Sequence, residues 1–203
     1  MPTLLRPLLL ALVFAIAATG AETAQAAPKK GKAKPRDDTR VPTGPTASEI
    51  DQGCDQLVAN KAQHTHRWFA QATVPGKAPA AWSAYASDAE LKARLKGLGA
   101  YESAETWHAA DGALYVEATA KNDAEAWTNL GAYCFRSDGS LARAKLTSTF
   151  MATEAPARVT RVEHYAPDGR LVRARSDALR SEHDAKGKVY KTASELPFAS
   201  LRQ

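Results

Sequence analysis

The fold is decided by residues 107–121, WHAADGALYVEATAK. An Asp-Gly pair, Asp111-Gly112, divides this stretch, and apolar Leu114 and Val116 then alternate with polar residues. Asp-Gly between two alternating runs is among the strongest short-range signals of a β-hairpin, because both residues tolerate the positive φ of a tight turn. The stretch therefore predicts two antiparallel strands with one apolar face and one face toward water.

The same unit recurs along the chain. An aromatic residue, an Asp-Gly pair and a leucine occur again in FRSDGSL (135–141) and YAPDGRL (165–171), and KGKV (186–189) is a weaker copy. The unit loosely resembles the tyrosine-aspartate repeats of bacterial exported proteins. Its glycines, however, are spaced 27, 30 and 18 residues apart, whereas a solenoid keeps its period. We interpret the copies as shared turn chemistry, which predicts three or four hairpins and a meander of six to eight strands.

Two helices are predicted before these strands. Ser48 can cap the first helix, with Asp51 three residues on, and an apolar stripe that includes Cys54 follows. We expect this helix to continue toward Phe69. The second helix begins at a capping box on Ser87 and carries three leucines at helical spacing.

These elements predict an α+β fold in which two N-terminal helices pack on one face of a curved antiparallel meander sheet. The alternative is the cone-shaped fold of nuclear-transport-factor-like domains, which also begins with helices and continues with long antiparallel strands. In that fold the helices cover a concave sheet and leave a pocket. The two differ in whether side chains fill the inner face of the sheet.

The chain divides into three segments. Residues 1–26 are typical of a secretory signal peptide, with Arg6 before an apolar run and the small-residue site Ala24-Gln25-Ala26 after it. The apolar run is shorter than the roughly 20 residues that a membrane-spanning helix needs, so we expect no transmembrane segment in the mature chain. Residues 27–47, rich in proline and lysine, predict a disordered basic linker. Residues 48–203 predict a single globular α+β domain.

Charge is divided unevenly between these segments. Of the formal net charge of +5, residues 28–47 carry +4, from six basic and two acidic side chains. Residues 48–203 carry 20 basic and 19 acidic side chains, so bulk charge gives no support to nucleic-acid binding by the domain. The linker is either a spacer attracted to an anionic envelope surface or a solvated segment whose charge keeps it soluble.

The chain has two cysteines, Cys54 and Cys134, and both follow the predicted signal peptide. An even number of cysteines in an exported chain favours a disulfide. The alternative is a pair of free buried thiols that behave as small hydrophobic groups.

The one local metal-like pair is formed by His64 and His66. On a strand the two imidazoles share one face, whereas on a helix they point about 200° apart. Zinc needs three or four ligands, and no third histidine lies nearby. We therefore expect no metal and no other cofactor, with His64 and His66 as the only local candidates.

An arginine cluster lies on the predicted third hairpin. Arg173 and Arg175 are two residues apart and share one face of a strand, and we expect Arg161 to lie across from them. Guanidinium groups suit carboxylates and phosphates, so the three predict contact with an anionic envelope component or a protein partner. The alternative is an exposed face whose charges discourage edge-to-edge pairing.

Catalytic signatures are missing from the sequence, which has no Gly-x-Ser-x-Gly, His-Glu-x-x-His or phosphate-binding glycine loop. We expect an exported bacterial envelope protein, periplasmic or extracellular, that binds a polymer or a protein without catalysis. The alternatives are a small-ligand-binding pocket protein and a cryptic secreted enzyme.

Overall fold

The structure is a computed structural model that describes residues 44–74, 77–151, 157–179 and 184–202. These residues all belong to one compact unit. The predicted signal peptide and nearly all of the predicted linker lie outside the described residues.

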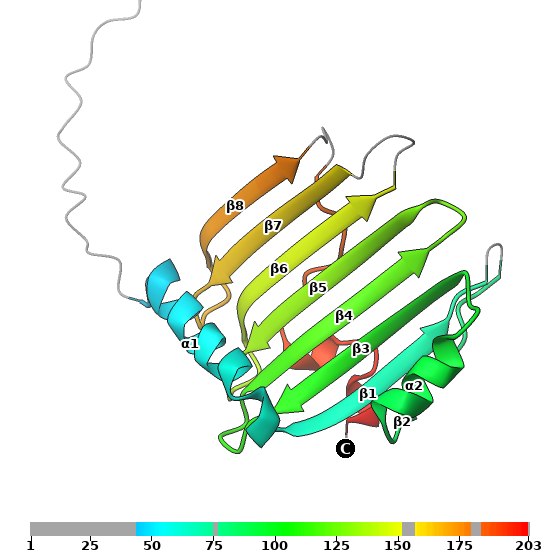
Figure 1. Ribbon diagram of the computed structural model, residues 1–203. Helices are drawn as coiled ribbons and strands as arrows, with labels where there is room; N and C mark the ends of the chain where they lie inside the picture. Colours follow the sequence, from blue (N-terminus) through cyan, green and yellow to red (C-terminus); the bar gives the residue numbers. More distant parts are fainter. Residues whose placement is uncertain (1–43, 75–76, 152–156, 180–183, 203) are drawn as a thin grey trace, which may run out of the picture. The chain divides into compact units, whose positions relative to one another are not determined.

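Eight strands of the described chain form one open antiparallel sheet in the order β2-β1-β3-β4-β5-β6-β7-β8 (Figure 1). The strands are β1 (Thr65–Ala72), β2 (Ser83–Tyr85), β3 (Ala100–His108), β4 (Leu114–Asn122), β5 (Trp127–Phe135), β6 (Leu141–Phe150), β7 (Ala157–Tyr165) and β8 (Leu171–Leu179). The prediction of an α+β fold with an antiparallel sheet of six to eight strands is confirmed.

Three hairpins turn at the Asp-Gly pairs, and in each pair only the glycine has a positive φ, +90° at Gly112 and +80° at Gly139 and Gly169. Each aspartate accepts a hydrogen bond at its Oδ1 from the backbone N–H two residues ahead. This geometry fits a type I turn that ends in a left-handed glycine, rather than a turn in which both residues have positive φ. The weaker copy at 186–189 forms no hairpin and belongs to the C-terminal segment.

The main core lies between the sheet and the C-terminal segment, residues 184–202. Figure 1 shows this segment, coloured orange to red, crossing behind the sheet. Phe198 is only 2% exposed and stacks on Phe69 of β1, with ring centroids 4.8 Å apart. Tyr133 of β5 donates a hydrogen bond from its hydroxyl to the carbonyl of Lys188 (2.8 Å). We call the side of the sheet that faces this segment the back face.

The back-face core consists mainly of large apolar side chains from β1 and β4–β7 and from the C-terminal segment. These side chains include Phe69, Leu114, Val116, Tyr133, Phe135, Leu141, Leu146, Val159, Tyr165, Leu196 and Phe198. At roughly 25 cal/mol for each Å² of apolar surface removed from water, burial of this set is the largest stabilising contribution in the fold.

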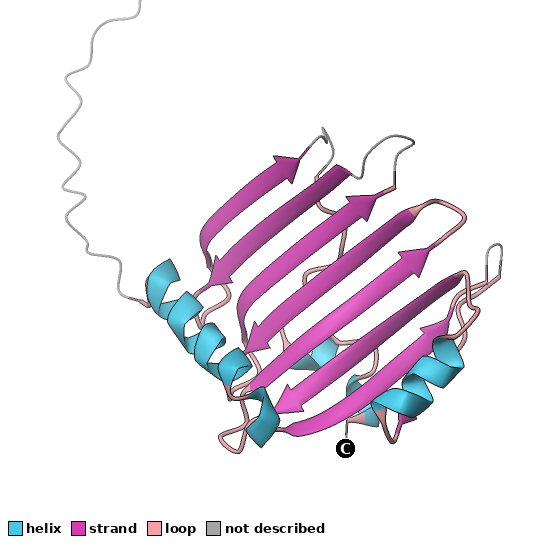
Figure 2. Ribbon diagram, in the orientation of Figure 1, coloured by secondary structure: helices cyan, strands magenta, loops and turns pink. Residues whose placement is uncertain are grey.

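The two helices lie at different places on the sheet, α1 (Ala47–Ala59) against β4, β6 and β7 and α2 (Asp88–Leu95) against β1 and β2. Figure 2 shows that neither covers the middle of the sheet. The prediction that two helices cover one face is therefore not confirmed, nor is the cone-shaped alternative, because the C-terminal segment and not the helices covers the back face. A cavity of about 250 Å³ remains between this segment and the sheet. None of the helices in the described residues has the length and apolar character to span a membrane.

Helix α1 begins and ends differently from its prediction. Thr46, not Ser48, is the N-cap, and it forms a capping box with Glu49. The helix ends at Ala59, and after a short 3-10 turn the chain enters β1 at Thr65. The expected continuation to Phe69 is wrong, because β-branched and aromatic residues from Thr65 onward pair with β3 along the whole strand.

A disulfide joins Cys54 of α1 to Cys134 at the end of β5, with 5.9 Å between the Cα atoms. This prediction is confirmed. Cys134 points to the side opposite Tyr133 and Phe135, where it packs with Ile50 and Ala142 in a second, smaller cluster. We call this side the front face. The disulfide therefore fixes α1 to the front face at one end of the sheet.

Removal of the disulfide should destabilise the fold substantially. It links residues 80 positions apart, so its loss restores conformational entropy to the unfolded chain. We expect the double variant Cys54→Ala/Cys134→Ala to lose about 2–5 kcal/mol of unfolding free energy, measured by urea titration. Wild-type protein in reductant is the control and should lose a similar amount. A loss below about 0.5 kcal/mol would show that α1 is held without the disulfide.

Candidate anion-binding face

The front face of β6–β8 carries a group of exposed cations. Lys145 lies on β6, Arg158 on β7, and Arg173 and Arg175 on β8. The strand register places Lys145 opposite Val162, and Val162 opposite Arg175, so these three lie in one row across the sheet. We call the four cations the front basic patch.

The front basic patch has no ion-pair partner in the part of the chain that the structure describes. Two other arginines of these strands, Arg143 and Arg161, have acidic partners. Arg143, also on the front face, contacts Asp51 and Asp55 of α1, and Arg161 lies 3.3 Å from Glu163. The patch cations are thus left available to an external anion, whereas their half-buried neighbours are not.

The structure places Arg173 and Arg175 together but separates Arg161 from them. Arg161 pairs with Ser176, so its side chain is on the back face. The expectation that Arg161 lies across from the other two is wrong, because even-numbered residues of β7 share a face with odd-numbered residues of β8. The register shift between His164 and Tyr165 sets this parity, because counting outward from the Asp168-Gly169 turn without the shift would put Arg161 opposite Arg175. The sequence analysis also missed Lys145 and Arg158, whose faces depend on this shift and on the one between Cys134 and Phe135.

Hydroxyl groups lie between the cations of the patch. Thr147, Thr160 and the exposed Asp177 form the row next to that of Lys145, and the Oγ1 atoms of the two threonines are 3.2 Å apart. A groove of about 460 Å³ opens beside the patch, between α1 and strands β4–β6, and shares Lys145 and Thr147 with it. Other residues lining the groove are Asp55, Tyr115, Glu117, Thr119 and Ala132. The face therefore combines fixed positive charge with hydrogen-bonding groups.

The two candidate metal ligands are not brought together into a site. His66 lies on the front face of β1, with Nε2 2.9 Å from Glu105 Oε2 and its ring stacked on Trp107. His64 precedes the strand and lines a different cleft. Within the described ranges, no three His, Cys, Asp or Glu side chains are grouped so that they could hold a metal ion.

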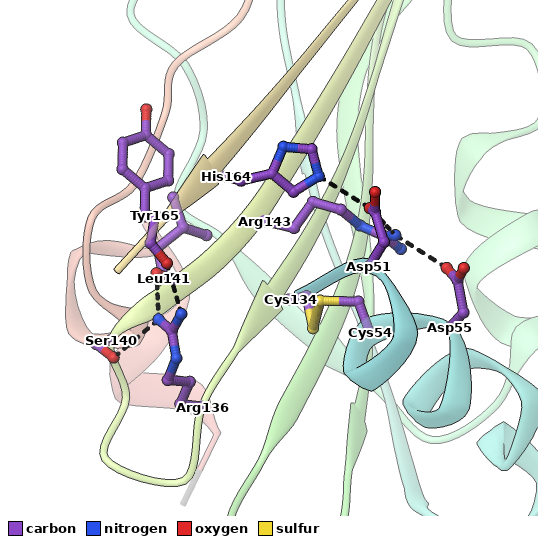
Figure 3. Close-up of a disulfide and its surroundings, with 10 residues drawn as sticks. All are labelled: Asp51, Cys54, Asp55, Cys134, Arg136, Ser140, Leu141, Arg143, His164 and Tyr165. Carbon is purple, nitrogen blue, oxygen red and sulfur yellow. Dashed lines mark hydrogen bonds and ion pairs between the residues drawn. A yellow bond between two sulfur atoms is a disulfide. The ribbon is translucent and has the colours of Figure 1, made fainter. Parts of the chain in front are cut away.

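Charged groups anchor α1 beside the disulfide. Figure 3 shows His164 and Arg143 converging on Asp51. His164 is 1% exposed, with Nε2 2.9 Å from Asp51 Oδ1, and Arg143 donates from Nη1 to Asp51 (2.8 Å) and to Asp55 (2.9 Å). Burial opposes ionisation of Asp51, but hydrogen bonds from Arg143 and His164 outweigh it and lower the pKa of that carboxyl. The cluster attaches the helix to β6 and β7.

This aspartate–histidine pair is not a catalytic triad. The Nδ1 of His164 is buried, and among the described residues no hydroxyl or thiol bonds to it. A nucleophile must lie within hydrogen-bond reach of its base, and among the described residues the one hydrogen-bond partner of this imidazole is Asp51. We therefore assign the pair to the attachment of α1.

Comparisons with protein-family models, with curated proteins and with solved structures find no match to this chain. We therefore infer the function from the arrangement of side chains in this structure.

Loss of Asp51 should destabilise the protein in a pH-dependent way. At neutral pH we expect Asp51→Ala to lower the unfolding free energy by about 1–3 kcal/mol, because Arg143 and buried His164 each lose a partner. The folded-state pKa of Asp51 is depressed, so its contribution is complete above the ordinary value of 3.8 and is lost as pH falls through the lowered value. The difference between wild type and variant should therefore shrink below about pH 4.

The measurement is urea unfolding of both proteins between pH 7 and the most acidic pH at which both still fold. Asp55→Ala is the matched control: its side chain is far more exposed, and it accepts a single bond from Arg143, so its loss should cost less than about 1 kcal/mol. Equal losses for the two variants at all pH values would contradict the role assigned to Asp51.

Proposed function

We propose that this chain is an exported, non-catalytic binding protein of the bacterial envelope that holds an anionic polymer against its front basic patch. The observation that carries the proposal is the set of four exposed cations on one sheet face, without ion-pair partners in the described residues. The proposal of export rests on the predicted signal peptide, and a disulfide is compatible with it.

The spacing of the cations suits a polymer better than a single small anion. Lys145 and Arg175 are two strands apart in one row, about 10 Å, since neighbouring strands are about 4.8 Å apart. Arg173 and Arg175 are separated along β8 by about 7 Å. Phosphates or carboxylates that recur along a chain can contact several of these positions at once, and the forked guanidinium groups favour bidentate contacts.

The ligand chemistry that fits is an anionic envelope glycan, such as lipopolysaccharide or an acidic cell-wall polymer. Thr147 and Thr160 lie between the cations and offer donors and acceptors for sugar hydroxyls. The predicted basic linker, residues 27–47, adds a non-specific attraction that salt weakens.

A second candidate function is the binding of a small ligand. A cleft of about 470 Å³ lies between α1 and the turns that follow β3 and β5, within the size range of small-molecule sites. Its lining is largely apolar, with the disulfide, Ile50, Leu57 and Phe135. The third class, a secreted enzyme, has no assembled nucleophile or metal set in the described parts of the chain, and we do not propose it.

The polymer proposal is tested by calorimetric titration with lipopolysaccharide, an acidic cell-wall polymer and anionic vesicles at increasing salt. We expect the triple variant Lys145→Ala/Arg158→Ala/Arg173→Ala to bind at least about tenfold more weakly, since each exposed charge contact contributes up to about 1 kcal/mol. The control is Lys92→Ala/Arg94→Ala/Lys96→Ala, which removes three exposed cations at α2 and should keep wild-type affinity.

Binding should also weaken as salt rises, because the contacts are screened. Equal affinity of wild type and the patch variant would contradict the proposal. Loss of binding on deletion of residues 27–43 alone, which removes the basic residues but keeps the Thr46 cap of α1, would assign the contact to the linker. Binding to vesicles alone would assign it to lipid.

A further inference from the structure

We propose that the chain forms a dimer in which two copies pair antiparallel along strand β8. The two edges of the sheet differ. At one edge β2 has three residues, whereas at the other β8 has nine, and its strand partner is β7. A long unpaired edge presents backbone N–H and C=O groups that are ready to accept another strand.

The outer edge of β8 is free in the described structure. Eight of its nine residues are exposed and Val172 is half-buried, and no described segment forms backbone hydrogen bonds to its outer side. Proteins commonly block such edges with charged side chains, a proline, a bulge or a covering segment, and β8 carries the charges of Arg173, Arg175 and Asp177. β8 has no proline, and the register shift of this hairpin occurs at its beginning, between His164 and Tyr165 of β7.

The charge pattern of β8 is complementary to itself. Its front side chains are Arg173, Arg175, Asp177 and Leu179 in order. If two copies pair antiparallel about Ser176, Arg175 of each copy lies opposite Asp177 of the other, and two-fold symmetry repeats the pair. On the back face the same register sets Ala174 opposite Ala178, so small side chains meet there.

The other registers are disfavoured by charge. In a register centred on Arg173, Arg175 or Asp177, the central residue of one copy lies opposite the same residue of the other copy. In a register centred on Ala174, Arg173 of each copy lies opposite Arg175 of the other. Like charges that lie directly opposite each other destabilise a strand pair. Among the five centres that overlap five or more residues of β8, only pairing about Ser176 sets no like charges opposite each other. Pairing about Arg175 is the nearest competitor, because it also sets Arg173 opposite Asp177 twice, but it keeps the two Arg175 side chains opposite each other.

The exposed leucine at the end of β8 gains contacts in this dimer. Leu179 is 54% exposed and lies beside Arg158 of β7. In the dimer it also lies opposite Arg173 of the second copy, whose aliphatic stem can cover it. The front faces of the two copies then meet at the symmetry axis, where Arg175 of each copy is paired with Asp177 of the other, and Lys145, Arg158 and Arg173 of both copies remain without an acidic partner among the described residues.

The test is sedimentation equilibrium of the purified chain without any polymer, from about 1 to 100 µM, the range in which an edge-strand contact of modest size is measurable. We expect a dimer. Arg175→Asp and Asp177→Arg should each weaken it at least about tenfold, because each sets like charges opposite each other twice. The double variant Arg175→Asp/Asp177→Arg should recover the wild-type affinity, since it restores opposite charges.

Arg158→Asp is the matched control. It makes the same charge change on the same face, but on β7 rather than at the edge, and should leave the dimer intact. A monomer throughout the concentration range would overturn the proposal, as would a double variant that fails to recover. Because polymer is absent, either result is independent of the proposed anion binding.

Discussion

The burial of the back face by the C-terminal segment is the interaction on which the rest of the structure depends. An open antiparallel sheet needs an apolar cover on one face, and here residues 184–202 supply it with two short 3-10 helices and no α-helix. Phe198 inserts against Phe69 and Trp82, and Leu196 packs in the same cluster. Because this segment covers the back face, the helices are left at the ends of the sheet and the front of β6–β8 stays exposed.

This arrangement decides which arginines have a partner within the protein and which do not. Where guanidinium groups are half-buried the structure pairs them: Arg143 with two aspartates of α1, Arg161 with Glu163, and Arg136 with the carbonyls of Leu141 and Tyr165. On the exposed front face of β6–β8 the acidic residue is Asp177, and among the described residues it forms no ion pair with the four cations. A surface that leaves four cations unpaired while neutralising their neighbours is well suited to an external anion.

The sequence predicts those parts of the fold that are encoded locally. The Asp-Gly pairs set the hairpins, and Cys54 and Cys134 set the disulfide. The cover of the back face was not predictable in this way, because residues 184–202 have no regular periodicity, and Phe198 and Leu196 gain their role only through contacts with distant strands. β1 was mistaken for helix because the apolar stripe of α1 runs into it, and pairing with β3 decides its structure. The position of Arg161 depends on the β-bulge between His164 and Tyr165, since a register shift of one residue moves a side chain to the opposite face.

The most direct test of the central claim is calorimetric unfolding of a chain truncated after residue 183. If the C-terminal segment supplies the cover of the sheet, the truncated chain should show no cooperative thermal transition and should bind a dye that reports exposed apolar surface. Phe198→Ala in the full chain should give an intermediate result, a cooperative transition with about 3–5 kcal/mol less stability. A truncated chain that unfolds cooperatively near the wild-type midpoint would contradict the claim, because another element would then have to cover the back face.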